Sequence, residues 1–231
     1  MKRIISIAAV TAIIAIAGCI IWASKTEPTF GTAGNELKIL IDAGHGAPDG
    51  GAVGVSGTVE KDINLSIAQK VGEILTAENI TVEYTRTGDE GLQDESAKTI
   101  REMKVSDMKK RRELMKESKA DLFLSIHMNS FPNGNASGLH IFYSAKYPET
   151  EALAVRMQDE IAGVTGAATH AVKTVSEKLF LMKEPPLPCI LAECGFLSNA
   201  EEERKLKEEE YQARIAWGIS RSIVGFYGKN E

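Results

Sequence analysis

Cysteine is scarce in this sequence, which has three cysteines among 231 residues. Cys189 and Cys194 fall on one expected strand, where an odd offset points them to opposite faces, roughly 16 Å apart and too far for a disulfide. A basic excess is also lacking: the net charge is −5, which argues against nucleic acid as a partner. No glycine-rich loop ends in Gly-Lys-Ser or Gly-Lys-Thr, so the sequence has no phosphate-binding loop of that kind.

What is present is the composition of an ordinary globular α/β domain, 43% hydrophobic and 26% charged. Short apolar runs alternate with segments whose apolar residues recur at helical spacing. The order of these segments predicts a single three-layer α/β/α domain with a mostly parallel sheet. The patterns predict strands at 39–41, 81–86, 120–127, 138–144, 178–182 and 189–193, and helices at 60–78, 106–118, 149–162 and from 199 onward.

Residues 1–24 stand apart from this domain. Two basic residues precede an almost unbroken apolar run over 4–22, which predicts a secretory signal peptide or a membrane anchor long enough to span a bilayer. The basic residues place the domain outside the cytoplasmic membrane. The sequence Ile-Ala-Gly-Cys19 is similar to a bacterial lipoprotein cleavage box, so lipidation at Cys19 is an alternative. Residues 25–36 are expected to be a linker, and 37–231 the catalytic domain.

Three of the expected strands end in side chains that can bind a metal or transfer a proton. The first strand breaks at His45, which has glycine on both sides, and a later one ends at His127. The last ends at Glu193, and a further carboxylate, Glu60, begins the first helix. The carboxyl ends of strands in open α/β sheets form the edge where ligands bind, so these groups are expected to lie near one another.

Imidazole and carboxylate are the zinc ligands of hydrolytic sites, and two histidines with one glutamate and an open position form a known catalytic set. One carboxylate is then left over as a base. Spacing alone does not assign the two roles, because a glutamate such as Glu60 in the first turn of a helix is usually a capping or helix-dipole group.

Four segments together resemble the zinc-dependent N-acetylmuramoyl-L-alanine amidases: Asp42-Ala-Gly-His-Gly, Glu60-Lys-Asp-Ile-Asn-Leu, Ser125-Ile-His-Met-Asn and Glu193-Cys-Gly-Phe-Leu-Ser-Asn. They occur in that family's order and spacing, and the likeness covers about residues 37 to 227. The chain departs at Ala47, where the family often has another glycine, and over 88–105, which is longer and more charged than usual. The resemblance implies the phosphorylase/hydrolase-like fold of those amidases.

The resemblance also implies roles for the four groups. His45, Glu60 and His127 would hold one Zn²⁺, and Glu193 would act as the general base. The reaction would be hydrolysis of the amide between N-acetylmuramic acid and L-alanine, on peptidoglycan glycan strands that carry stem peptides. Short domains of this kind resemble the amidases of spore cortex maturation, where muramic δ-lactam forms, with general cell-wall remodelling as the other setting.

Two rival functions remain at this point: a zinc carboxypeptidase of similar architecture, and an inactive wall-binding scaffold protein. The presence of all four chemical groups argues against the scaffold. A carboxypeptidase would need a guanidinium group to bind a free carboxylate, and the sequence shows no clear one. Besides peptidoglycan, the expected partners are the membrane, through the N-terminal segment, and an accessory protein that braces the metal site. Nucleic acid is not expected.

Three further side chains could be taken for functional groups. Cys194 beside the predicted base is expected to be a packing residue rather than a nucleophile. His140 is expected to be a core or surface histidine rather than a ligand. His170 is a weaker candidate for a contact with substrate.

Supporting roles are expected for residues around the predicted ligands. Asp42 and Asn129 would contact either the ligands or the substrate. Arg111, at a position where the resembled family carries arginine, is expected to be structural. The polar segment 88–105 is expected to be a solvated loop, with a lid beside the cleft as the alternative.

Overall fold

One six-stranded sheet contains all three strands that end in a candidate functional side chain. The computed structural model describes residues 36–175 and 179–228. The strands lie in the order β2-β1-β3-β6-β4-β5; β4 runs antiparallel to β6, and the other neighbouring pairs are parallel. Their bounds are β1 Lys38–Ala43, β2 Thr81–Tyr84, β3 Leu122–Asn129, β4 His140–Tyr143, β5 Lys173–Thr174 and β6 Cys189–Phe196.

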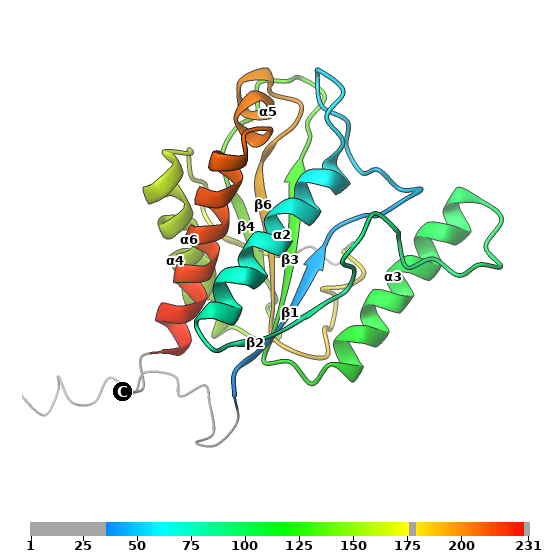
Figure 1. The fold of residues 1–231 in the computed structure, drawn as a ribbon, viewed down its shortest axis with the longest axis horizontal. Coiled ribbons are helices and arrows are strands. Elements are labelled where there is room, and N and C mark those ends of the chain that lie inside the picture. Colours follow the sequence, from blue (N-terminus) through cyan, green and yellow to red (C-terminus); the bar gives the residue numbers. More distant parts are fainter. Residues whose placement is uncertain (1–35, 176–178, 229–231) are drawn as a thin grey trace, which may run out of the picture. The chain divides into compact units, whose positions relative to one another are not determined.

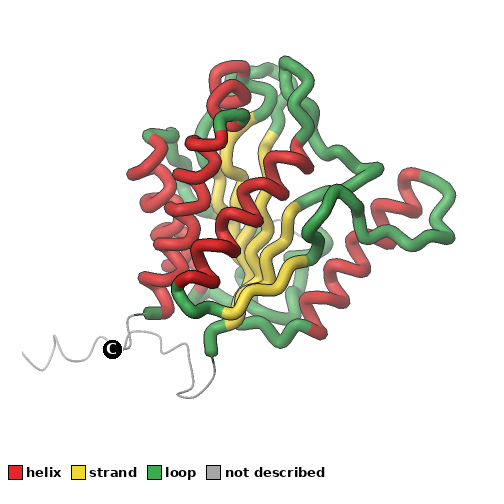
Figure 2. Tube along the Cα trace, in the orientation of Figure 1, coloured by secondary structure: helices red, strands yellow, loops and turns green. Residues whose placement is uncertain are grey.

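Helices cover both faces of this sheet (Figures 1 and 2). The helices are α2 Glu60–Ala77, α3 Ile100–Glu117, α4 Thr150–Thr165, α5 Ala200–Leu206 and α6 Glu209–Tyr227. Side chains from α2, α4 and α6 form the larger core on one face, whereas α3 and the segment 179–187 form a smaller core on the other. The predicted three-layer α/β/α architecture with a mostly parallel sheet is confirmed.

β1 shows how the sequence places side chains on the two faces. Successive side chains of a strand point to opposite sides, so Ile39 and Ile41 enter the larger core and Leu40 enters the smaller one. All three are at most 1% exposed. Burial on both faces explains why the strand is a continuous apolar run rather than an alternating one.

The helix predicted at 106–118 is present, but its predicted start at Ser106 is wrong. α3 begins at Ile100, after a capping box in which the Thr99 hydroxyl accepts from the Glu102 N–H (3.2 Å) and the Glu102 carboxylate accepts from the Thr99 N–H (3.0 Å). Ser106 instead donates its hydroxyl to the Glu102 carbonyl (2.9 Å), as an interior helical serine does. The end of the segment 88–105 is therefore helical, not a solvated loop.

The predicted strand at 178–182 is also wrong over its described residues, because 179–182 form a turn and the edge strand is β5; residue 178 lies outside the described part of the chain. The apolar residues there have another role: Leu181 and Met182 are buried against the smaller core. Arg112 binds the carbonyls of this turn, including those of Phe180 (3.1 Å) and Lys183 (2.9 Å). The apolar pattern reflects a segment that covers the sheet without joining it.

The helix predicted from Asn199 onward is two helices. Asn199 caps α5 as expected, accepting from the Glu201 N–H (3.0 Å). The first helix ends at Leu206. The Gln212 side-chain amide donates to the Leu206 carbonyl (2.7 Å), which has no helical partner because the helix ends there. No glycine or proline marks this break, so the sequence pattern runs through it.

No helix within residues 36–175 and 179–228 combines the length and apolar character needed to cross a membrane. The predicted signal peptide or anchor, the lipidation site at Cys19 and nearly all of the predicted linker lie outside the described residues.

A buried ion pair joins α3 to β1. The Arg111 guanidinium donates to Asp42 and, through Nε, to Asp107 (2.7 Å), while the Asp42 carboxylate also accepts from the hydroxyls of Ser125 and Thr85 (2.7 Å each). Burial alone would raise the pKa of Asp42, but the Arg111 guanidinium and these hydroxyls hold that pKa below its usual value. The predicted structural role of Arg111 therefore has a physical basis, because this side chain holds α3 against the end of β1.

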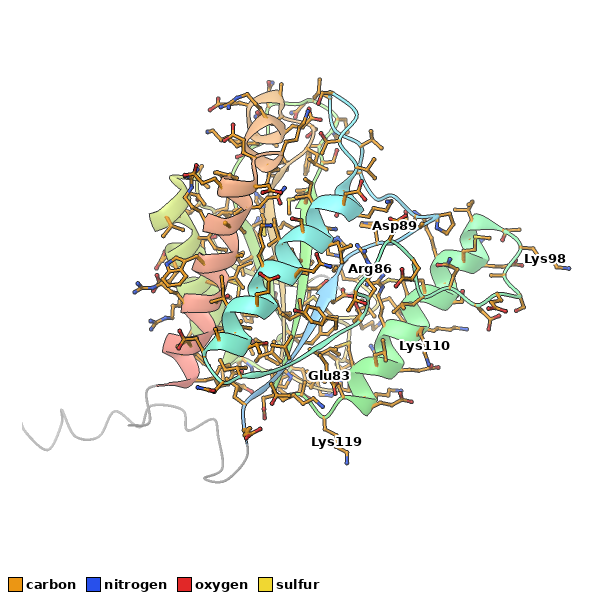
Figure 3. The ribbon with its side chains drawn as sticks, in the orientation of Figure 1. Glu83, Arg86, Asp89, Lys98, Lys110 and Lys119 are labelled. Carbon is orange, nitrogen blue, oxygen red and sulfur yellow. The ribbon has the colours of Figure 1, made fainter. Side chains whose placement is uncertain are left out.

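Replacing this arginine should destabilise the fold. Arg111→Met leaves the Asp42 carboxylate buried without its cation, which typically costs about 3–5 kcal/mol of unfolding free energy. Lys110→Gln is the matched control, because Lys110 projects from α3 with an exposed side chain (Figure 3) and its loss should cost within about 0.5 kcal/mol. Urea denaturation of both variants measures the difference. Equal stability of the two would contradict the role assigned to the ion pair.

Candidate metal centre

The end of β1 is held in an unusual backbone conformation. His45 has φ +64°, in the left-handed region that non-glycine residues rarely adopt. Two arginines bind the carbonyls around it: Arg86 donates to Ala43 (2.9 Å) and Gly44 (3.1 Å), and Arg111 donates to His45 (2.5 Å). Such conformations persist where neighbouring contacts fix them, and they occur frequently at functional sites.

Three predicted side chains meet beside this turn. The His45 Nε2 atom lies 3.2 Å from Glu60 Oε2, and the His127 Nδ1 atom lies 2.9 Å from Glu60 Oε1. One nitrogen or oxygen atom from each residue falls within 4.8 Å of the others. The residues come from the end of β1, the start of α2 and the end of β3, so the fold brings together segments far apart in the sequence. Two imidazoles and a carboxylate at this separation can bind a metal ion.

Glu60 is turned toward the two imidazoles and is more than a helix-end carboxylate. It is 3% exposed, and it accepts from the N–H groups of Ala52 (2.8 Å) and Met128 (3.1 Å) and from the Asn64 amide (3.2 Å). Burial raises the pKa of Glu60, but the neighbouring His127 and His45 hold that pKa far below its usual range. The carboxylate is therefore ionised and turned toward both imidazoles.

Asp49 is a residue that sequence reasoning missed. Its carboxylate lies 3.0 Å from His45 Nδ1, accepts from the Gly51 N–H (3.2 Å) and pairs with Lys104 Nζ (3.0 Å). A carboxylate on one ring nitrogen orients the imidazole and leaves the other nitrogen available to a metal. The carboxylates of Glu60 and Asp49 outweigh the effect of burial and raise the pKa of His45 to about 9. The sequence signal that could have indicated this contact is an aspartate four residues after the histidine, in a glycine-rich loop.

Two glycines make room for the three side chains. A Cβ at Gly44 would lie 2.2 Å from the His127 ring, and a Cβ at Gly51 would lie 2.5 Å from Glu60 Oε2. Gly51 also has φ +72°, which favours glycine. Glycine at these positions thus allows the imidazole and the carboxylate to pack directly against the backbone.

Glu193 faces the same centre from the neighbouring strand. β6 pairs with β3 so that Glu193 stands opposite His127. The Oε2 atom of Glu193 is buried and has no hydrogen-bond partner among the described residues. Burial raises the pKa of this carboxyl to about 7, although His127 acts to lower it. A carboxylate of this kind is available to exchange a proton with a molecule bound in front of it.

A cavity of about 390 Å³ opens in front of these groups. Its wall on the sheet side includes His45, His127 and Glu193, and its opposite wall is formed by α3 and residues 179–182. The two imidazoles and the Glu193 side chain thus line one cavity.

Asp42 and Asn129 occupy different positions relative to this centre. Asp42 lines the cavity floor, but its oxygens are bound by Arg111, Ser125 and Thr85, so it supports the strand end. Asn129, at the end of β3, accepts from the N–H of the next residue (2.8 Å).

The other candidate side chains lie apart from the centre. Cys189 and Cys194 are buried free thiols, which confirms that they form no disulfide, and burial raises the pKa of Cys194, as suits a packing residue. His140 is half-buried and lies against His170, with the ring centroids 4.2 Å apart and the rings tilted by 45°, and His170 Nε2 lies 2.9 Å from the Ser137 carbonyl oxygen. Within the described residues, neither histidine belongs to a cluster that could hold a metal.

Comparison with known proteins gives consistent matches. The family described as N-acetylmuramoyl-L-alanine amidase matches residues 39–224. The germination-specific N-acetylmuramoyl-L-alanine amidase of Bacillus subtilis is 36% identical over 189 residues, covering 82% of this chain and 79% of the relative. The CwlD amidase of Clostridioides difficile, solved in complex with the GerS lipoprotein, is 35% identical with a TM-score of 0.79, over 84% of this chain and 99% of that one. The catalytic domain of CwlV from Bacillus (Paenibacillus) polymyxa is 33% identical with a TM-score of 0.72, over 83% and 98%.

Filling the space at Gly44 should weaken metal binding. Gly44→Ala places a methyl group where the His127 ring now lies, so the imidazole must move away from Glu60. A metal at a hundredfold excess over its dissociation constant adds about 2.7 kcal/mol of stability. We expect a chelator to lower the melting temperature of the wild type, and to change that of Gly44→Ala much less.

Gly163→Ala is the control, because a Cβ at Gly163 meets no atom within 4 Å and alanine favours a helix. This variant should keep the full effect of the chelator. The interpretation of the cluster is wrong if Gly44→Ala responds to the chelator as strongly as Gly163→Ala does.

Proposed function

We propose a metal, a base and a biological setting for this chain, which belongs to the N-acetylmuramoyl-L-alanine amidase family. The chain is an amidase that hydrolyses the bond between N-acetylmuramic acid and L-alanine, with peptidoglycan stem peptides as substrate. The observation that supports the detailed assignment best is the side chain of Glu193, which has a buried, unpartnered oxygen and lines one cavity with His45 and His127.

The proposed metal is one Zn²⁺ per chain, held by His45, Glu60 and His127. The donor set fits this ion, because two imidazoles and one carboxylate are the ligands of several hydrolytic zinc sites. When bound, zinc would lower the pKa of water and polarise the amide carbonyl. Asp49 orients the His45 ring, and the N–H groups of Ala52 and Met128 orient the Glu60 carboxylate.

Glu193 is the proposed general base. Its carboxylate takes a proton from the attacking water as the water oxygen bonds to the carbonyl carbon, and it then passes that proton to the nitrogen of L-alanine as the carbon–nitrogen bond breaks. A pKa raised to about 7 by burial is suited to both transfers near neutral pH. Apolar side chains such as Phe123, Leu181 and Leu191 line the same cavity as this carboxyl.

The proposed setting is spore cortex maturation, with general wall remodelling as the alternative. Support comes from similarity to an amidase named germination-specific and to an amidase solved with a lipoprotein partner. We therefore also propose an accessory protein that braces the metal centre. The rival carboxypeptidase is less well supported, because the guanidinium in the cavity wall, Arg111, is already bound by Asp42 and Asp107.

Two isosteric substitutions separate the roles of the two glutamates. Glu193→Gln keeps the size of the side chain but cannot accept the proton, so kcat should fall by roughly 10²-fold or more while zinc content stays near one per chain. Glu60→Gln should instead lose zinc, with activity partly restored by added metal. The measurement is metal analysis beside amide hydrolysis on muropeptides.

The roles are exchanged if Glu193→Gln loses zinc and Glu60→Gln retains it. A fully active Glu193→Gln would contradict the proposed base altogether.

We propose that the domain lies outside the cytoplasmic membrane, attached or exported through residues 1–24. The apolar run over 4–22 supports this, as does a substrate found in the cell wall. Protease added to intact protoplasts should therefore digest the domain, whereas protection would refute export. Cys19→Ser should leave membrane attachment unchanged unless the cysteine is lipidated.

A further inference from the structure

A second hollow lies on α3, outside the catalytic cavity. It measures about 640 Å³ and lies over one face of the first half of the helix. Its lining is Ile100, Arg101, Lys104, Val105, Met108, Lys109 and Phe180. Four of these, Ile100, Lys104, Met108 and Phe180, also line the catalytic cavity, so the two hollows adjoin along these side chains. We call the outer one the α3 groove.

The α3 groove combines exposed apolar surface with positive charge. Ile100 is 60% exposed, Val105 48% and Phe180 46%. The cations Arg101 and Lys109 form no ion pair with any residue in the described part of the chain, and no acidic residue lines the groove. A local basic strip on a chain whose net charge is −5 indicates an acidic ligand.

The wall opposite α3 is fixed before any ligand binds. Arg112 donates to the carbonyls of Phe180 (3.1 Å), Lys183 (2.9 Å) and Glu184 (2.7 Å), and its guanidinium lies 5.6 Å from the centre of the Phe180 ring. These contacts hold Phe180 beside α3. A preformed wall reduces the entropy that a ligand loses on binding.

We propose that the α3 groove binds the acidic stem peptide of the substrate beyond the bond that is cleaved. This inference rests on the proposed function. A peptide whose first amide lies at Glu193 must leave the catalytic cavity, and the α3 groove adjoins that cavity. The carboxylates of the stem pair with Arg101 and Lys109, while its aliphatic parts lie on Ile100 and Val105. The α3 groove thus selects stems by their charge.

The test compares two muramoyl peptides that differ only in stem charge, one with free carboxylates and one with these groups amidated. We expect the wild type to cleave the free form with a kcat/KM about fivefold higher, the effect of two exposed ion pairs. Arg101→Gln/Lys109→Gln should lose this preference through a higher KM for the free form, with kcat unchanged. Raising the ionic strength should reduce the preference of the wild type in the same way.

Lys110→Gln is the control, because Lys110 lies on the same helix but lines neither hollow. It should keep the full preference. The inference is overturned if the wild type cleaves both peptides equally, if the double variant loses activity equally on both, or if Lys110→Gln loses the preference too. Equal cleavage would mean that the α3 groove does not recognise the stem carboxylates and binds a different ligand, such as a protein. Cleavage of neither peptide by the wild type would instead refute the proposed amidase reaction itself.

Discussion

The carboxylate of Glu60, placed between two imidazoles, is the contact on which the rest of this site depends. Burying a carboxylate is costly unless it is paired and hydrogen-bonded, and here two histidines, two backbone N–H groups and an amide compensate for the lost water. These partners come from three segments, so the loop after β1, the start of α2 and the end of β3 must all be in place. The proposed zinc ion would join the same three segments.

The two faces of the sheet differ in how completely they are packed with apolar side chains. The larger core under α2, α4 and α6 is almost entirely apolar and supplies stability. The smaller core under α3 is interrupted by the buried pair of Asp42 and Arg111 and by the cavity. The cavity that contains the proposed site therefore lies on the less completely packed face. Arg111 links the stability of this face to the geometry of the site, because it binds both Asp42 and the backbone of His45.

Much of this arrangement could be predicted from the sequence. Strands buried on both faces produce apolar runs that cannot be missed, and a polar residue at the end of each run identifies the edge where His45, His127 and Glu193 lie. The start of α3 was misplaced because Ser106 looks like a cap, whereas the Thr99 and Glu102 pair forms the actual one. The turn at 179–182 and the break after Leu206 depend on tertiary hydrogen bonds from Arg112 and Gln212, which no local pattern records. Asp49 was overlooked because its role appears only when the loop folds back on His45.

The central claim is that His45, Glu60 and His127 hold one zinc ion beside Glu193. Anomalous diffraction from crystals of the zinc-loaded protein, recorded on both sides of the zinc absorption edge, tests this most directly. We expect one strong anomalous peak per chain, within bonding distance of His45 Nε2, His127 Nδ1 and a Glu60 oxygen, with Glu193 outside the coordination sphere. A peak bound by Glu193 instead of Glu60, or located at the His140 and His170 pair, would contradict the claim.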